Sequence, residues 1–167
     1  MAENILKNLN LFVDGRNYAG KVTSLTPPAL TILTEDFRPG GRDLPEKVDM
    51  GMEALEPSFV LGSYDPEILK LFGWKKGDPV AFVFRGAAQS DDGTVTAIKI
   101  TMRGRITSIE RDTWTPGEMV PINVTVAASY YQEDINGEVV VEIDGPNMKR
   151  IIGGEDQLAD IRNALGF

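Results

Sequence analysis

The second half of the chain alternates apolar and polar side chains with a period of two, and this pattern limits the fold more than any other feature. It covers residues 80–85, 98–106 and 122–130. Successive side chains of a β-strand point to opposite faces of a sheet, so each stretch predicts a strand with one apolar and one polar face. The apolar faces are expected to consist of Val80, Phe82, Phe84, Ile98, Ile100, Met102, Ile106, Ile122, Val124, Val126, Ala128 and Tyr130.

Short turn sequences separate the predicted strands. Asp14-Gly15, Asp91-Asp92-Gly93 and Asn136-Gly137 each lie between apolar runs, which is typical of a β-hairpin. We expect Tyr18–Leu25 to pair back on Leu9–Val13 across the first of these turns. With roughly eight strands in all, the predicted class is mainly β, with two packed antiparallel sheets in a sandwich or barrel.

Two short α-helices complete the predicted fold. Asp65 is placed to cap the first helix, with Pro66 at its first position and Glu67 near the positive end of its dipole. Glu155 and Asp156 are expected to begin the second helix, which closes the chain. No internal repeat or break in composition is visible, so residues 1–167 are expected to form one domain.

The segment from Arg38 to Glu56 interrupts this regular pattern. Glycines, prolines and charged residues follow one another closely, and only Val48–Met52 shows a trace of alternation. A connection of this length inside a compact domain is usually functional or mobile. We favour the functional interpretation, an assembly loop, over a merely flexible linker.

The composition argues against an enzyme and against a nucleic-acid-binding protein. Cysteine and histidine do not occur, so disulfides, thiolate ligands and the commonest general base are missing. The 25 acidic and 17 basic residues give a net charge of −8, which opposes binding to phosphates. We expect no catalytic residue, cofactor or metal. Without a signal-peptide pattern or a membrane-length apolar run, we expect a soluble, cytoplasmically made product.

A small group of basic residues lies on one predicted strand. Lys99, Arg103 and Arg105 share its polar face. One interpretation is a phosphate-binding stripe. The other is pairing with acidic neighbours such as Glu110, or contact with another subunit, and the net negative charge favours it. Trp114, in a predicted loop, is expected to be a contact residue or a core anchor rather than a platform for a sugar.

Several segments, in order along the chain, resemble the major tail tube proteins of contractile phages and of R-type phage-tail-like bacteriocins. The most specific match is the long loop, Phe37–Gly41 followed by Val48–Leu55, although Arg42 stands where the family often has methionine. The resemblance covers nearly the whole chain. Its other segments are Leu9–Gly15, Val22–Leu33, Met102–Arg105, Ser129–Tyr131, Val141–Asp144, Asn147-Met148 and Gly153–Gly166.

This resemblance implies a structural role in a contractile injection particle, either a phage tail or an R-type bacteriocin. Six copies would form a ring, and rings would stack into the hollow inner tube, with strands of all six copies joined into one β-barrel. A contractile sheath would surround the tube, and baseplate, initiator and terminator proteins would bound it. DNA would be passing cargo only, and the chain itself would bind no membrane. The protein would be made in the bacterial host cytoplasm and assembled into the particle.

The resemblance also implies that the loop, at about residues 37–55, reaches a neighbouring subunit and the adjacent ring. Lys99, Arg103 and Arg105 are a second candidate subunit contact. Two alternatives stay open: the tube protein of a type VI secretion system, and a β-sandwich module that binds a ligand such as a carbohydrate. The expected loop contacts are Phe37, Arg38, Pro39, Gly40, Gly41, Arg42, Val48, Asp49, Met50, Gly51, Met52 and Glu53.

Overall fold

The computed structural model describes residues 3–74 and 76–166, and antiparallel strands dominate these residues. The mainly β class with two short helices is confirmed. The elements are β1 (Ile5–Val13), β2 (Arg16–Asn17), β3 (Val22–Thr26), β4 (Ile32–Phe37), β5 (Glu46–Met52), β6 (Ser58–Leu61), α1 (Pro66–Lys70), β7 (Val80–Gln89), β8 (Val95–Arg111), β9 (Ile122–Ile135), β10 (Glu138–Asp144), β11 (Lys149–Ile152), β12 (Glu155–Asp156) and α2 (Ala159–Ala164).

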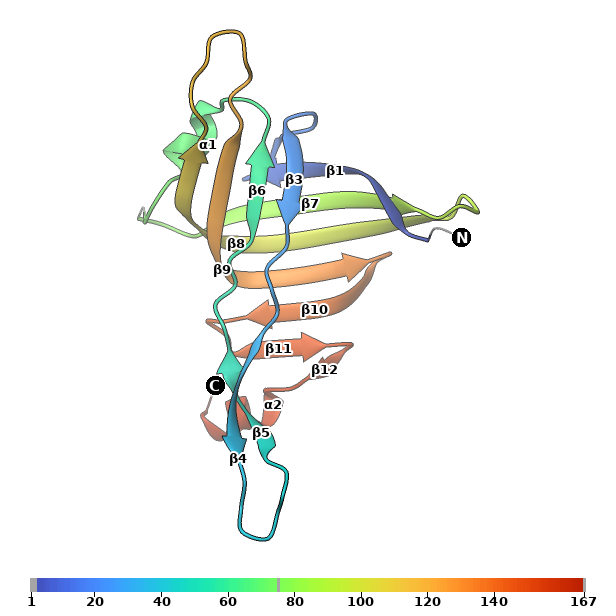
Figure 1. The fold of residues 1–167 in the computed structure, drawn as a ribbon, viewed down its shortest axis with the longest axis vertical. Coiled ribbons are helices and arrows are strands. Elements are labelled where there is room, and N and C mark those ends of the chain that lie inside the picture. Colours follow the sequence, from blue (N-terminus) through green and yellow to red (C-terminus); the bar gives the residue numbers. More distant parts are fainter. Residues whose placement is uncertain (1–2, 75, 167) are drawn as a thin grey trace.

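Most strands belong to one sheet that folds into two layers (Figure 1). The order β12-β11-β10-β9-β8-β7-β1-β2 forms the first layer, while β6 and β3 extend the second layer from the first half of β9. The long strands β8 and β9 bend and pass from one layer to the other. The two predicted sheets are therefore continuous with each other, an arrangement in which strands turn the corner of a barrel-like sandwich.

Two β-bulges mark the corner between the layers. Arg103 lies opposite Tyr130, but Gly104 lies opposite Ala128, so Ser129 is an extra residue on β9. A second shift leaves Thr107 extra on β8. A bulge bends its strand and increases the local twist, and these two bulges lie where β8 and β9 change direction.

The first bulge also shifts the alternation along β9. Upstream of it, Val124 and Val126 are fully buried, as the pattern predicts. Downstream, Tyr131 is buried and Tyr130 is only half-buried, so the prediction that Tyr130 faces the core is wrong. One inserted residue moves every later side chain to the other face. Burial raises the pKa of the Tyr131 hydroxyl, which donates to Glu133.

The core lies between the two layers, where an aromatic cluster joins them. The ring of Phe59 in β6 packs against Phe82 and Phe84 of β7, with ring centroids 5.7 and 5.5 Å apart. Tilted and edge-to-face contacts of this kind add to the free energy gained by burying the rings. The remaining buried apolar residues include Leu11, Val13, Leu61, Ile68, Met102, Ile106, Ile122, Val124 and Val126.

The N-terminal hairpin is much shorter than predicted. Asp14 and Gly15 both have positive φ and form a tight turn, after which only Arg16 and Asn17 pair back on β1. Tyr18 then turns into the core, and β3 pairs with β6 in the other layer. The prediction that residues 18–25 pair with β1 is wrong, because Val22 and Leu25 of β3 instead cover the open side of the core.

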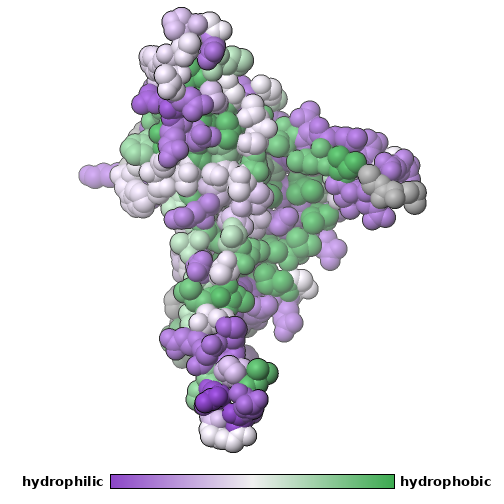
Figure 2. Space-filling model, viewed as in Figure 1, coloured by the Kyte–Doolittle hydropathy of each residue, from purple (hydrophilic) through white to green (hydrophobic). Residues whose placement is uncertain are grey.

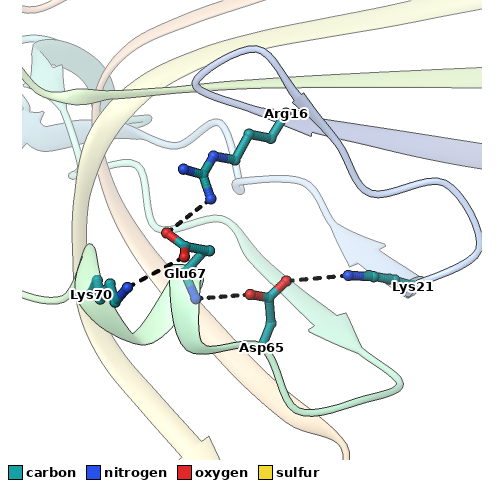
Figure 3. Close-up of polar contacts among 5 residues, drawn as sticks. All are labelled: Arg16, Lys21, Asp65, Glu67 and Lys70. Atoms are coloured by element: carbon teal, nitrogen blue, oxygen red, sulfur yellow. Dashed lines mark hydrogen bonds and ion pairs between the residues drawn. The ribbon is translucent and has the colours of Figure 1, made fainter.

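The first helix begins as its sequence predicts. Asp65 caps α1 through a 2.9 Å hydrogen bond from the Glu67 backbone N–H, and Pro66 occupies the first turn. Figure 3 shows the surrounding ion pairs: Arg16 and Lys70 both reach Glu67, and Lys21 lies 3.8 Å from Asp65. The helix is thereby tied to the N-terminal hairpin.

The second helix begins later than predicted. Glu155 and Asp156 form β12 rather than the first turn of a helix, because Gly153 and Gly154 adopt positive φ and turn the chain back on β11. The helix α2 follows at Ala159–Ala164, and Arg162 on it pairs with Asp156 at 2.7 Å. Neither helix among the described residues has the length and apolar character needed to cross a lipid bilayer.

We expect Gly104→Ala to destabilise the fold strongly. A Cβ at this position would lie 2.3 Å from the carbonyl oxygen of Ala127 and 2.8 Å from the Ala128 Cα, both of them backbone atoms of β9. Overpacking of this kind costs about 3 kcal/mol, measured as the change in the free energy of unfolding in urea. Gly40→Ala, at a position with open space and no positive φ, is the matched control. Equal urea midpoints for the two variants would contradict this account of the corner.

Candidate assembly surfaces

The segment predicted as an irregular loop forms the tip and the second strand of a β-hairpin that projects from the body (Figure 1). We call residues 32–52 the arm. β4 and β5 pair only with each other, from Ile32 opposite Met52 to Phe37 opposite Glu46, and residues 38–45 form the tip. The prediction of a loop over residues 37–55 is therefore wrong for residues 46–52. The arm is exposed on both faces, so the trace of alternation at Val48–Met52 does not correspond to a half-buried strand.

The arm exposes apolar side chains to solvent. Phe37 is 56% exposed and Leu44 at the tip is 78% exposed, and Val48 and Met50 are also exposed. Figure 2 shows hydrophobic and hydrophilic residues side by side on the arm at the bottom of the view. A two-stranded hairpin without packing is marginally stable, and exposed apolar patches usually mark interaction sites.

The expected loop contacts are distributed along the arm. Phe37 ends β4, residues 38–42 begin the tip, and residues 48–52 belong to β5. Glu53 follows β5 and donates its backbone N–H to the Thr31 carbonyl at 2.9 Å, which closes the base of the hairpin. These residues therefore lie on one projecting element, with Met52 near the body and the tip far from it.

An ion pair with a buried arginine anchors the base of the arm. Arg150 in β11 is buried, and its Nη2 donates to Asp49 Oδ2 at 2.5 Å. The hydrogen bond from Arg150, and a second from the Gly51 backbone N–H, hold the pKa of Asp49 below its usual value. A cavity of about 440 Å³ lies beside this pair, lined by Met52 of the arm and by Ile161. The arm is thus fixed to the body at its base.

Two of the three basic residues of β8, Arg103 and Arg105, already contact other groups of the chain. The Arg103 guanidinium lies over the Tyr130 ring, 4.3 Å from its centroid. Arg105 Nη2 donates to the Gly77 carbonyl at 3.2 Å. Lys99 lies opposite Asp134 of β9. Ion pairing with Glu110 was predicted wrongly, because that residue lies opposite Asn123, beyond the corner in the other layer.

A third surface, which the sequence analysis missed, is the open edge of β1. β2 covers only its last two residues. The Leu11 carbonyl accepts a hydrogen bond from the Tyr18 backbone N–H on the side of β1 that faces away from β7. In a strand, the N–H of a residue points to the same side as its carbonyl, so the N–H groups of Leu11 and of Leu9, two residues earlier, also face away from β7. They are bonded instead to the side-chain oxygens of Asn10 and Asn8, at 2.8 and 2.9 Å. The sequence did contain a signal for this edge, because Asn8 and Asn10 lie two residues apart and each precedes a leucine.

A groove runs beside this edge. It has a volume of about 470 Å³ and is lined by residues 8–10 of β1, by Val22 of β3 and by Arg85–Ala87 of β7. An unpaired strand edge is a ready template for pairing with another strand. The asparagine side chains occupy the N–H groups that an incoming strand would use.

An exposed aromatic pair lies at the other end of the molecule from the arm. Trp114 is 66% exposed, so it is not the core anchor that was one of its predicted roles. Its ring meets Tyr64 edge to face, with centroids 5.8 Å apart, and Arg111 Nη1 donates to the Tyr64 hydroxyl at 2.8 Å. Met119 completes this surface.

We expect Asp49→Asn to loosen the arm. The substitution removes the charge that faces buried Arg150, while Asp36→Asn breaks only the exposed pair with Lys47, which contributes little. Hydrogen exchange of the amides of residues 32–52 should accelerate in the first variant and stay unchanged in the second.

The same anchor depends on pH. Because the pKa of folded Asp49 is lowered, its contribution is complete above the ordinary pKa of aspartate and is lost as the pH falls through the lowered value. Exchange in the arm of the unmodified chain, corrected for the intrinsic pH dependence, should therefore rise in acid towards that of Asp49→Asn. Equal protection of the two chains at neutral pH would refute the anchoring role of the ion pair.

Comparison with known proteins places this architecture in a family. The family model described as phage tail tube protein FII matches residues 3–166. The tail tube protein of Escherichia phage P2 is 33% identical over 166 residues, covering 97% of this chain and 96% of the relative. The major tail tube protein of Serratia phage KSP20 is 32% identical over 165 residues, covering 97% and 95%.

Solved structures share the fold at low sequence identity. A chain of the sheath–tube complex of an extracellular contractile injection system, PVC, in its extended state matches with a TM-score of 0.57 at 11% identity, covering 75% of this chain and 87% of that one. A chain of the anti-feeding prophage cap matches with a TM-score of 0.57 at 12% identity, over 75% and 87%. On the family model and the two full-length relatives together, the chain belongs to the phage tail tube protein FII family.

Proposed function

We propose that this chain, as one tube domain, builds the inner tube of a contractile injection particle. Six copies form a ring, and rings stack into a hollow shaft. Family membership supports the tube role, and the shared fold with chains of sheath–tube and cap assemblies supports the contractile setting. The observation that carries the proposal is the presence of two unpartnered surfaces on one folded body, the β1 edge and the arm.

The β1 edge supplies the contact within a ring. A strand from the neighbouring copy enters the groove beside Asn8–Asn10 and displaces the two asparagine side chains. Each displaced side-chain bond is replaced by a backbone bond of the same kind, so pairing loses no hydrogen bond. Repeated around a ring, such pairing joins the copies into a closed barrel without exposed edges.

The arm supplies the contact between rings. It is fixed at its base through Asp49 and extends along the longest axis of the molecule, beyond the body (Figure 1). Exposed apolar residues mark interaction sites, and an element that reaches past its own subunit is placed to be covered by the next copy in the stack. The basic residues of β8 lie on the outer face of the first layer and serve a subunit contact, through Arg103 and its Tyr130 platform.

The tube works with other particle proteins and has no catalytic role. A sheath surrounds it, and baseplate and terminator proteins begin and end it. The protein is made in the cytoplasm of a bacterial host and assembled into the particle. If the particle is a phage, DNA passes through without lasting contact, which the net charge of −8 per copy favours.

Leu9→Pro should block ring formation without unfolding the body. Proline removes the N–H of Leu9, which faces away from β7 and bonds only to Asn8, so the ladder between β1 and β7 is kept. Leu9→Ala loses the same side chain but keeps the N–H and is the matched control. We expect rings from Leu9→Ala and monomers from Leu9→Pro by electron microscopy, with equal far-UV circular dichroism spectra showing that both variants are folded. Normal rings from the proline variant would rule out pairing at this edge.

Shortening the arm should separate ring formation from stacking. Residues 38–45 are replaced by Asn-Gly, which joins the opposed residues Phe37 and Glu46 by a two-residue turn. The expected product is single rings with an unchanged melting temperature. Replacing residues 90–94 of the β7–β8 hairpin by Asn-Gly, between opposed Gln89 and Val95, is the control and should leave stacking intact. Tubes of full length from the shortened arm would contradict the stacking role.

A further inference from the structure

The surface around Trp114 is a concave apolar site that nothing in the described body covers. It is formed by the turn after β6 and by residues 112–121, which connect β8 to β9. Trp114 and Met119 are 66% and 75% exposed, and Tyr64 is 45% exposed. They line a cavity of about 390 Å³ with Gly62, Ser63 and Val120. Large exposed aromatic and methionine side chains are the residues that dominate binding energies at protein interfaces.

The site is held in shape by its own contacts. The edge-to-face contact fixes the Tyr64 and Trp114 rings relative to each other, and the hydrogen bond from Arg111 fixes the Tyr64 hydroxyl. Arg111 is the last residue of β8, so the rings are attached to the end of a long strand that continues into the core. A preorganised site of this kind loses little conformational entropy when it is filled.

The position of the site identifies its occupant. Residues 112–121 and the arm lie at opposite ends of the longest axis of the molecule (Figure 1). The arm therefore cannot reach the site of its own copy. Two complementary surfaces at opposite ends make a head-to-tail contact, which leaves a free arm and a free site at every addition and so builds an open-ended stack.

The chemistry of the arm tip complements the site. Leu44 in the tip and Phe37, the last residue of β4 before it, are exposed apolar side chains. Arg38 makes no ion pair within residues 3–74 and 76–166, and the same holds for Asp112 and Glu118, on either side of Trp114. An unpaired cation on the tip thus corresponds to two unpaired anions at the site, and such complementarity favours the correct register.

We propose that the cavity lined by Tyr64, Trp114 and Met119 receives the arm tip of a second copy of this chain. Phe37 and Leu44 fill the cavity, and Arg38 lies against Asp112 and Glu118. This inference rests on the proposed stacking of the chain and specifies which surface accepts the arm.

Cysteine cross-linking tests the contact directly, because the chain has no cysteine of its own. Leu44→Cys combined with Met119→Cys should yield a ladder of disulfide-linked oligomers when tubes are oxidised and run on a non-reducing gel. The control is Leu44→Cys with Val95→Cys, where Val95 is exposed at the distant β7–β8 turn. Disulfides form only between closely placed residues, so tubes without a ladder in the first pair would overturn the receiving site.

Two further results separate this proposal from the proposed function. Trp114→Ala should lower the yield of tubes at least about tenfold, as expected for a central aromatic contact, while its monomer keeps its melting temperature. Arg38→Glu should also lose stacking and should regain it with Asp112→Lys and Glu118→Lys. Normal tubes from Trp114→Ala that fail to recruit the particle's sheath protein would assign the site to the sheath instead. If the unmodified chain forms neither rings nor tubes when seeded with a baseplate, the proposed function itself fails.

Discussion

The close approach of two backbones at Gly104 determines the shape of the whole molecule. A Cβ at this position would lie 2.3 Å from the Ala127 carbonyl oxygen, so β8 and β9 can approach this closely only with glycine here. The adjacent bulge at Ser129 bends β9, and the Ser129 carbonyl is satisfied by the Gly145 N–H at 2.9 Å. Because the strands turn at this point, one sheet provides both layers. Phe59 of the second layer can then pack on Phe82 and Phe84 of the first, which creates the core.

The folded body leaves three surfaces incomplete, and each is incomplete in a different way. The β1 edge lacks backbone partners, and the side chains of Asn8 and Asn10 accept hydrogen bonds from its N–H groups instead. The arm lacks packing, since its paired strands cover neither of their faces. The site around Trp114 has shape but no occupant among the described residues. In the proposed tube, copies of the same chain supply all three missing contacts: backbone pairing at the β1 edge, burial of the arm, and an occupant for the cavity.

The sequence predicted the regular half of the fold well and the irregular parts poorly. Alternation located β7, β8 and β9 because one face of each is buried, and the Asp65-Pro66-Glu67 cap located α1 because capping is a local interaction. The bulge at Ser129 was invisible, since no residue type is required at the extra position, and it reversed the orientation of Tyr130. The arm was missed as a hairpin because its strands are exposed on both faces, and the trace of alternation at Val48–Met52 was too weak to define a strand. Its glycines, prolines and charged residues still marked it as a long connection, interpreted as an assembly loop.

The anchoring of the arm explains how an exposed hairpin can serve as a specific connector. A free two-stranded hairpin would sample many orientations, and ordering it on binding would cost conformational entropy. The Asp49–Arg150 pair and the Glu53–Thr31 backbone bond fix the base, so the direction of the arm is set before any contact is made. In the proposed contact between copies, only the tip is left to be ordered on binding. Most of the ordering cost is thus met during folding of the monomer, and the apolar tip residues can contribute more fully to association.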